Sequence, residues 1–466
     1  MAKPTPARAL ECLTLALPWA LALLVTAGWL HWALTQVDAH EASIASKGGT
    51  AYAVFVQISH NWTTGWGWVQ TAHPTYVDQW YWGGHFGVLW LAAAKLSALS
   101  DSPWFLARFQ VTLIGLGCFT SWLLGRAEGG SAGGLAGLVL YAGSGAVAFI
   151  AMEDYQDLAL CLPFIPLAVL AARHGRCWTF VLAAAALAAT REELWLLLPL
   201  VGLSKNLGRA MLGAGVALAW YWLLTRTTPI AWEPPVLFRV DEMHGSLQPI
   251  LDPRRLSLET HVFAWGNALP WFLLQPVCAA VVICLTLFHA QPELSGLTSG
   301  MALSHHYAPV AGFALTGGVI VLGRLAGTKG WAAVLAVLLA CSSTAWALQR
   351  SLPELERQIH RGDGATHPAW VLLEQVPGAA VLYVPAPLSP AAAKRRWLAS
   401  DQSGTQRISE DRITHAIVPE GCGIQGRVLA RSAPWVLLEN PSGLPFDGAP
   451  LPWELHGSRF MGCTTR

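Results

Sequence analysis

The sequence predicts an all-α polytopic membrane bundle of about 10–11 transmembrane helices, followed by a small α/β domain. Hydrophobic residues make up 54% of the 466 residues and charged residues only 12%, whereas soluble proteins average about 25% charged residues. Long apolar runs alternate with short loops that hold the charges, a pattern typical of transmembrane helices. After residue 348 proline, glycine and charged residues increase. We therefore expect a transmembrane domain over residues 1–348 and a second domain over residues 349–466.

The first apolar run, Leu13 to Leu34, is predicted to be an uncleaved helix. It has the length of about 20 residues that crosses a bilayer, which exceeds the usual apolar core of a signal peptide. The candidate spans are 12–34, 103–125, 130–151, 157–173, 176–190, 194–206, 209–225, 266–288, 307–324 and 330–348. Several are shorter than a full crossing, so we expect some of them to be oblique or broken.

The distribution of basic residues predicts the orientation. If the N-terminus is cytoplasmic and the spans alternate, the basic residues of the short loops also face the cytoplasm, which agrees with the positive-inside rule: Arg126, Arg173, Arg176, Lys205 and Arg209. Residues 263–304 must then cross twice or not at all, and we expect 289–304 to form a short or broken crossing buried among other helices. The C-terminal domain is therefore expected outside a multi-pass protein of the inner (plasma) membrane.

The C-terminal domain shows signals of short strands. The apolar runs Ala379–Val384, Ile413–Val418 and Val436–Glu439 have strand length and are bounded by turn residues. Residues 443–466 are expected to be coil. Cys422 and Cys463 could pair if this domain faces an oxidising compartment, and the sequence leaves that pairing open.

The longest loop of the membrane half, residues 35–102, is rich in aromatic residues. Its two apolar stretches, 51–62 and 85–99, are short for a span and are expected to lie along the membrane interface. Its tryptophans are Trp62, Trp66, Trp68, Trp80, Trp82 and Trp90. These rings either anchor the loop at headgroup depth or form a platform for a sugar or a polyprenyl chain, and the sequence leaves both alternatives open.

Acidic residues in two loops are candidates for catalysis. Glu153, Asp154 and Asp157 lie close together before a predicted helix, where they form a site or cap that helix. Arg191, Glu192 and Glu193 interrupt apolar sequence without a turn residue. Charges at membrane depth are usually functional. The alternative is a buried Arg–Glu pair that tightens a helical hairpin.

Imidazole and guanidinium groups on the same face are candidates for substrate binding. His305, His306 and Tyr307 open a span, and imidazole can act as a base, a metal ligand or a phosphate ligand. Arg254 and Arg255 in the loop 226–262 either bind phosphate or remain solvated. The net charge of +1 argues against a nucleic-acid partner. No P-loop, zinc-spaced cluster, nucleophile elbow or dinucleotide fingerprint is present in the sequence.

Four sequence blocks, in order, resemble those of a family of uncharacterised prokaryotic membrane proteins, the domain of unknown function 2079. The family blocks read "GDHF…p…LlxxQ", "FHxE", "KEd" and "HYxapl". The similar segments here are Gly84-His85-Phe86 with Ser102–Gln110, Phe149–Tyr155, Thr190–Leu194 and His305–Pro309. The match covers roughly residues 45–330.

That family in turn resembles the GT-C superfamily of polytopic glycosyltransferases. The resemblance implies a GT-C-like enzyme on the extracytoplasmic face, with a polyprenyl-phosphate-linked sugar as donor and catalytic acids in outer loops. It leaves open a divalent cation, Mg²⁺ or Mn²⁺, as cofactor. The predicted catalytic residues are Glu192, Glu193, Asp154, Glu153 and Asp38. The predicted substrate-binding residues are Arg191, His85, His305, His306, Tyr307, Trp80, Trp82, Gln57, Arg254 and Arg255.

The chain departs from the family pattern where the family has acids. The family's "DlgifdQ" block corresponds to residues 51–57, which keep Phe55 and Gln57 but lose both acids, and Gly84 replaces the Asp of "GDHF". Either Asp38, Glu41 or Asp78 takes over, or the protein is a non-catalytic relative that binds a lipid-linked glycan or a protein partner. A transporter is a third alternative, although the sequence shows no internal repeat with broken helices. The sugar, the acceptor and the oligomeric state stay open.

Overall fold

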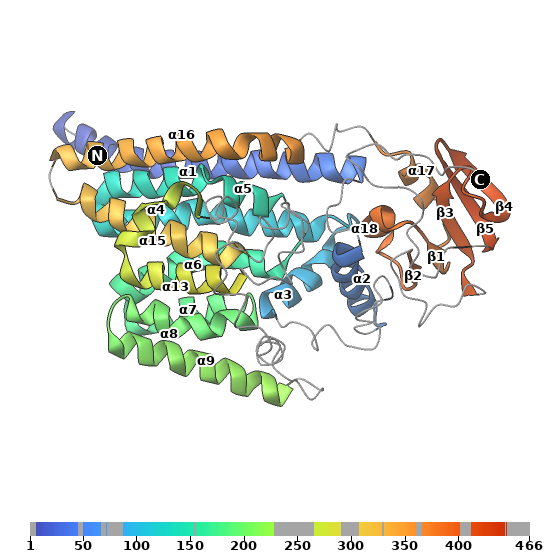
Figure 1. The fold of residues 1–466 in the computed structure, drawn as a ribbon, viewed down its shortest axis with the longest axis horizontal. Helices are drawn as coiled ribbons and strands as arrows, with labels where there is room; N and C mark the ends of the chain where they lie inside the picture. The colour runs from blue at the N-terminus through green and yellow to red at the C-terminus, as the bar shows by residue number, and fades with distance from the viewer. Residues whose placement is uncertain are drawn as a thin grey trace, which may run out of the picture. The chain divides into compact units, whose positions relative to one another are not determined.

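The computed structural model, drawn in Figure 1, describes residues 6–44, 50–66, 71, 87–152, 155–227, 265–289, 307–328, 330–359, 366–400, 412–442 and 444. Two compact units separate along the chain. The helical unit comprises Met1–Leu34, Gln110–Met152 and Gln156–Glu356, and the mixed unit comprises Thr35–Phe109, Glu153–Tyr155 and Arg357–Arg466. The predicted first loop therefore belongs to the same unit as the C-terminal residues.

Apolar helices build the helical unit. They are α1 (Pro6–Ser43), α4 (Phe105–Ala142), α5 (Gly145–Ala151), α6 (Cys161–His174), α7 (Cys177–Ala188), α8 (Leu198–Leu203), α9 (Leu207–Thr227), α13 (Pro276–His289), α15 (Ala308–Ala326) and α16 (Gly330–Ile359). The residues of α1 after Leu34, of α4 before Gln110 and of α16 after Glu356 belong to the mixed unit. Among the described residues, 5 helical segments are long and apolar enough to cross a membrane. They are Ala16–Ser43, Phe105–Ala142, Asp157–His174, Ala308–Ala326 and Gly330–Pro353. The predicted polytopic membrane bundle is confirmed.

Two of the predicted spans are the arms of one hairpin within α4. The helix breaks at Gly129 and at Gly130, whose φ of +66° lies in the region that favours glycine. The Tyr141 hydroxyl donates to the Ile114 carbonyl at 2.9 Å across the two arms. A Cβ on Gly133 would lie 2.4 Å from the Gly125 carbonyl oxygen, so only glycine permits this close approach.

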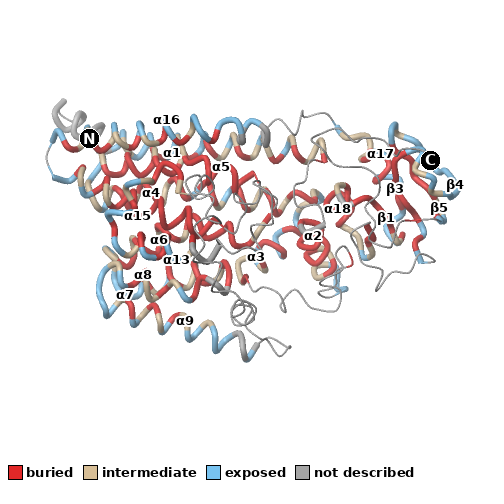
Figure 2. Tube along the Cα trace, viewed as in Figure 1, coloured by how far each residue is buried: buried red, intermediate tan, exposed pale blue. Residues whose placement is uncertain are grey.

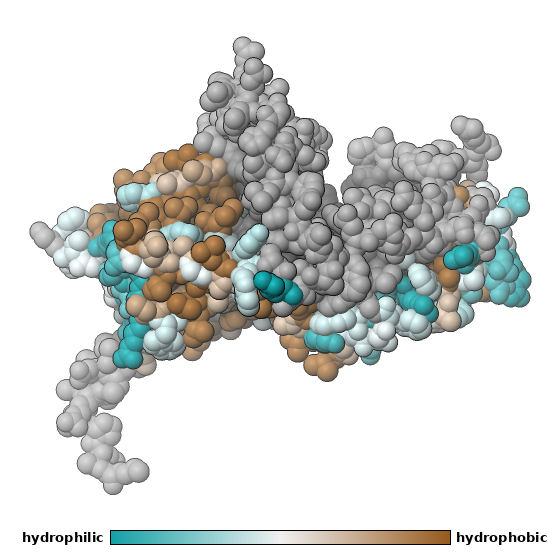
Figure 3. Space-filling model, turned by 90° about the horizontal axis from the view of Figure 1, so that it is seen from below, coloured by the Kyte–Doolittle hydropathy of each residue, from teal (hydrophilic) through white to brown (hydrophobic). Residues whose placement is uncertain are grey.

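Helix α15 is the most deeply buried long helix in the described part of the helical unit. Its apolar residues are buried on all sides, as expected of a helix enclosed by others, and it packs against α6 and α13. The buried interior is red in Figure 2. Large apolar side chains such as Trp178, Leu218 and Trp331 are exposed instead, and much of the described helical surface is brown in Figure 3. In a membrane such a surface faces lipid.

Several helix ends differ from the prediction for identifiable reasons. The span expected at 194–206 begins as a 3₁₀ turn, Glu192–Leu197, before the short α8, and the span at 266–288 becomes α-helical only at Pro276. Helix α16 continues past residue 348 to Ile359, because arginine, glutamate and glutamine propagate a helix as well as leucine does. Residues 290–306, which hold the predicted broken crossing, lie outside the described residues.

The mixed unit contains a 5-stranded sheet in the order β2-β1-β3-β5-β4. The strands are β1 (Leu382–Tyr383), β2 (Leu398–Ala399), β3 (His415–Pro419), β4 (Gln425–Ser432) and β5 (Trp435–Ser442). β1 runs parallel to β2 and β3, whereas β5 is antiparallel to β3 and β4. The predicted small α/β domain is confirmed. The sequence did not predict β4, since this edge strand is largely exposed and lacks an apolar run.

Four short helices complete the described mixed unit. They are α2 (Thr50–Thr63), α3 (Val88–Leu96), α17 (Ala369–Leu373) and α18 (Ser389–Ala392). α2 contacts α3 and α18. Consecutive residues of α2 from Tyr52 to Ser59 are buried, so this stretch is enclosed by other parts of the protein. Its place along the membrane interface stays a prediction.

The hairpin of α4 gives a stability prediction. We expect Gly133→Ala to lower the free energy of unfolding by about 1–3 kcal/mol, because the new methyl group overlaps the backbone of the opposite arm. Thermal unfolding in detergent, followed by tryptophan fluorescence, measures the change. Gly215→Ala in α9 is the control, since a Cβ there meets nothing within 4 Å; equal losses in the two variants would contradict the prediction.

Candidate functional site

The structure describes some of the predicted site residues and not others. Glu153, Asp154, His85, Trp80, Trp82, His305, His306, Arg254 and Arg255 lie outside the described residues, as do the side chains of Glu192 and Glu193. Arg191, Asp38, Gln57 and Tyr307 are described, and Tyr307 directly precedes α15 with 8% of its surface exposed. Roles in catalysis and binding remain predictions for all of these residues.

Arg191 is the centre of a buried polar cluster in the helical unit. Its Nη1 lies 3.4 Å from Oδ1 of Asp157, and the two side chains are only 2% and 1% exposed. Asp157 precedes α6 and Arg191 follows α7, so the pair joins the ends of this helical hairpin. The sequence predicted, as one alternative, a buried Arg–Glu pair that tightens this hairpin. The structure has such a buried pair, but the partner of Arg191 is the aspartate Asp157.

A buried glutamine, Gln110, binds the backbone just before Asp157. The Gln110 side chain, at the end of the first family-like block, is fully buried. Its Oε1 accepts from the Gln156 backbone N at 2.6 Å, and its Nε2 donates to the Ile150 carbonyl at 3.4 Å. Gln110, Asp157 and Arg191 are called the buried polar cluster below. Within it, the Asp157–Arg191 pair holds the chain at the point where Glu192 and Glu193 follow Arg191.

Asp38 lies in the mixed unit, within a group of two carboxylates around one arginine. Arg108 Nη2 lies 2.7 Å from Asp38 Oδ1 and also pairs with Glu41. The Ser102 hydroxyl donates to Glu41 at 2.6 Å and accepts from Arg108 at 2.7 Å. Both carboxylates are thus engaged by the same guanidinium, although the side chain of Asp38 is 60% exposed and that of Glu41 is 21% exposed.

The Gln57 amide is engaged by the chain itself. Its Nε2 donates to Thr71 Oγ1 at 3.0 Å and to the carbonyl of Arg396 at 3.2 Å. Its Oε1 accepts from the Thr71 backbone N at 2.8 Å. These bonds join α2 to the segment before β2, which gives Gln57 a structural task within the mixed unit.

A cationic and aromatic surface in the mixed unit was not predicted from the sequence. The run Lys394-Arg395-Arg396 was the available signal. The Arg396 guanidinium lies 3.4 Å from the Trp66 ring centroid, and Lys95 Nζ lies 3.9 Å from that of Trp62. Arg395 instead donates to the carbonyls of Leu373, Val376 and Pro377 at the end of α17. Lys95, Lys394, Arg396, Trp62 and Trp66 are called the cationic surface below.

Lys394 and Arg395 make a further positive charge unfavourable near the cationic surface. Burial lowers the pKa of His60, and nearby Lys394 and Arg395 lower it further. Burial also lowers the pKa of Lys394. A bound anion would relieve this repulsion. Within the described residues no group of three His, Cys, Asp or Glu side chains could hold a metal ion.

Comparison with known proteins supports the fold. No family model matches the chain, and no curated protein sequence matches it. The structure of ArnT from Cupriavidus metallidurans bound to undecaprenyl phosphate is similar, with 14% identity, a TM-score of 0.55, and coverage of 92% of this chain and 98% of that one. An oligosaccharyltransferase from Archaeoglobus fulgidus, tethered with an acceptor peptide, gives 9% identity and a TM-score of 0.30 over 88% and 70% of the two chains, too low to carry an argument. This chain therefore shares its overall fold with that ArnT structure.

The buried ion pair gives the second prediction. Asp157→Asn removes the carboxylate charge that pairs with the buried Arg191 and is expected to cost about 3–5 kcal/mol of unfolding free energy. Arg191→Gln in the same chain should recover part of that loss. The control, Glu439→Gln, removes the exposed pair with Arg427 and should cost about 1 kcal/mol or less. Similar losses for Asp157→Asn and the control in thermal unfolding would disprove the role of the pair.

His60 gives a pH prediction for the mixed unit. Because its pKa is lowered by burial and by two cations, the unfolded chain binds a proton more readily than the folded one. Stability should therefore fall as the pH decreases below about 6.5. In melting temperatures measured from about pH 7.5 to about pH 5.5, His60→Gln should show a smaller decline than the wild type. The control is His31→Gln, and a decline in His60→Gln that parallels the wild type would refute the prediction.

Proposed function

We propose that the protein is a GT-C-type glycosyltransferase that takes a sugar from a polyprenyl-phosphate carrier at the extracytoplasmic face of the inner (plasma) membrane. The fold likeness is the observation that carries the proposal, since it extends over 92% of this chain and 98% of the ArnT chain. That ArnT structure holds undecaprenyl phosphate. Fold alone does not fix chemistry, so the residues must supply the rest of the argument. The four blocks that resemble the domain of unknown function 2079 are compatible with the same assignment.

The carrier phosphate is the leaving group, and cations must stabilise its charge. The cationic surface supplies such groups in the mixed unit. Arg396 and Lys95 both lie over tryptophan rings, and these rings are suited to stack on a sugar or a polyprenyl chain. Arg254 and Arg255, as well as His85, His305 and His306, remain further proposed ligands.

Deprotonation of the acceptor hydroxyl requires a carboxylate held in a fixed position. Asp157 does not suit this task, because Arg191 neutralises it. Glu192 and Glu193 follow Arg191 directly on the 3₁₀ turn, so the buried polar cluster anchors their backbone. We assign the base to Glu192 and propose Glu193, Glu153 and Asp154 as oxygen ligands of Mg²⁺ or Mn²⁺.

One observation supports an extracytoplasmic mixed unit. Cys422 is disulfide-bonded, and disulfides persist in oxidising compartments; Cys463 lies outside the described residues. The basic loop residues Arg126, Arg173 and Arg176 belong to the helical unit. In the proposed orientation these residues are cytoplasmic, in accord with the positive-inside rule.

A non-catalytic relative that binds a lipid-linked glycan is the second candidate. The observation that favours it is the Arg108 group, because Asp38 and Glu41 are two of the three acids expected to replace those missing at Ala51, Val56 and Gly84. The third, Asp78, lies outside the described residues. Asp38 and Glu41 are both engaged by Arg108. Such a protein would bind the carrier lipid without transferring the sugar.

The experiment that separates these candidates compares a deletion strain complemented with wild type, Glu192→Gln, Glu193→Gln or Glu374→Gln. Mass spectrometry of extracted lipids and surface glycans detects the species that gains a sugar, and immunoblotting checks protein levels. Loss of the base should reduce this species by about 100-fold or more. Glu374, exposed in the mixed unit, is the matched control. A glycan profile unchanged by deletion of the protein would exclude the transferase.

A further inference from the structure

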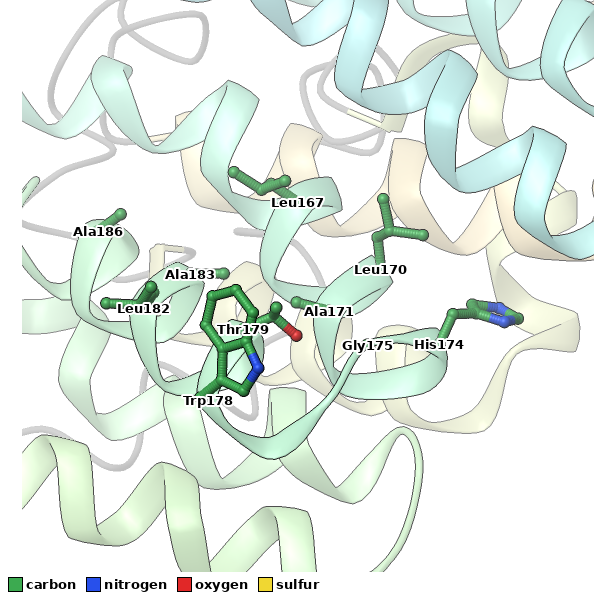
Figure 4. Close-up of a pocket in the computed structure, with 10 residues that line it drawn as sticks. All are labelled: Leu167, Leu170, Ala171, His174, Gly175, Trp178, Thr179, Leu182, Ala183 and Ala186. Carbon is green, nitrogen blue, oxygen red and sulfur yellow. The ribbon is translucent and has the colours of Figure 1, made fainter.

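A groove lies in the helical unit between α6 and α7, beside the turn that joins them, with a volume of about 500 Å³ (Figure 4). Leu167 and Leu170 of α6 and Trp178 and Leu182 of α7 form its sides. Ala171, Ala183 and Ala186 also line it, and their small side chains leave the space open. Known ligand sites have volumes of about 300–1,000 Å³, so the groove is large enough to hold part of a lipid.

The groove has one polar and one apolar end. At the polar end lie His174, Gly175 and Thr179, next to the turn. Trp178, 58% exposed, stands at the start of α7, and exposed tryptophan is typical of headgroup depth. From Trp178 to Ala186 the helix rises about 12 Å, close to the ~15 Å hydrocarbon depth of one leaflet. The long axis of the groove therefore has the depth that one acyl chain occupies in its leaflet.

Several basic side chains lie near the polar end of the groove, and one of them has no ion-pair partner among the described residues. Glu128 binds Arg173, His174 and Arg324 through distances of 2.5, 2.7 and 3.1 Å. Arg209 donates to the Gly175 carbonyl at 2.7 Å and holds the turn. Arg176 is exposed, and among the described residues its side chain has no ion pair or hydrogen bond. Arg176 follows the lining residue Gly175 in the sequence, so the turn that borders the groove carries a cation without a counter-charge among the described residues.

We propose that this groove binds one acyl chain of an anionic glycerophospholipid of the bilayer, with the lipid phosphate held by Arg176. The apolar length fits the chain, and the uncompensated cation complements the phosphate. The proposal is independent of the sugar-transfer reaction. It also has a structural consequence, because the α6–α7 hairpin is then closed at both ends. The lipid would brace the end at Gly175, and the Asp157–Arg191 pair joins the opposite end.

Native mass spectrometry of the full-length protein in detergent tests the proposal. Dioleoyl phosphatidylglycerol and dioleoyl phosphatidylcholine serve as the anionic and zwitterionic probes. The wild type should retain phosphatidylglycerol preferentially, and Arg176→Gln should reduce its retention by about fivefold, the effect of one arginine near an anionic headgroup. Retention of phosphatidylcholine should not change. The control, Arg350→Gln, removes another exposed arginine, in α16, and should behave as the wild type.

The apolar half is tested with Ala186→Leu, which fills the groove, against Ala185→Leu, one residue away and outside it. Both alanines are half-buried, and leucine maintains a helix. Ala186→Leu should lower retention of both lipids and Ala185→Leu of neither. If Ala186→Leu does not fold, Leu182→Ala tests the same wall, since Leu182 is 61% exposed.

Equal retention of the two lipids by the wild type, or an Arg176→Gln variant without effect, would overturn the proposal. Displacement of phosphatidylglycerol by equimolar undecaprenyl phosphate would assign the groove to the carrier lipid and also overturn it.

Discussion

Within hydrocarbon no water is available to polar groups, so each of them must find a partner inside the protein. This constraint determines which helices of the helical unit are tied together. Asn267 donates to the Leu140 carbonyl at 2.7 Å and to Thr344 at 2.8 Å, which joins the segment before α13 to α4 and α16. The Asp157–Arg191 pair closes the α6–α7 hairpin, and Glu128 gathers three basic side chains at the other end of α6. The outer surface of the helical unit carries many exposed apolar side chains, which can face lipid.

The same constraint distinguishes charged side chains that are paired within the protein from those that are available to bind a substrate or to react. Arg191 is buried and neutralised by Asp157, so its contribution to a site is to fix the backbone that carries Glu192 and Glu193. Asp38 and Glu41 are engaged by Arg108. The cationic surface differs, because Arg396 and Lys95 lie on tryptophan rings. This contrast supports the proposal that the cationic surface holds a phosphate.

Local signals in the sequence predicted much of the fold, and contacts between distant residues account for what they missed. Apolar runs located α6, α7, α9 and α15, and the basic turn beside His174 predicted a loop. The partner of Arg191 lies 34 positions away, and no pattern in a single sequence identifies it. The short apolar run of α2 does not reveal that other parts of the protein enclose it. β4 and the Lys394–Arg396 run were missed because exposed polar sequence looks like loop until its neighbours are known.

The central claim is that a chain of this fold handles a polyprenyl phosphate. Photo-crosslinking in nanodiscs with a benzophenone analogue of undecaprenyl phosphate, followed by peptide mapping, tests it most directly. We expect saturable labelling of peptides that contain Glu192 or Arg396, blocked by undecaprenyl phosphate but not by undecaprenol, which lacks the phosphate. Equal competition by the alcohol, or labelling that does not saturate, would contradict it.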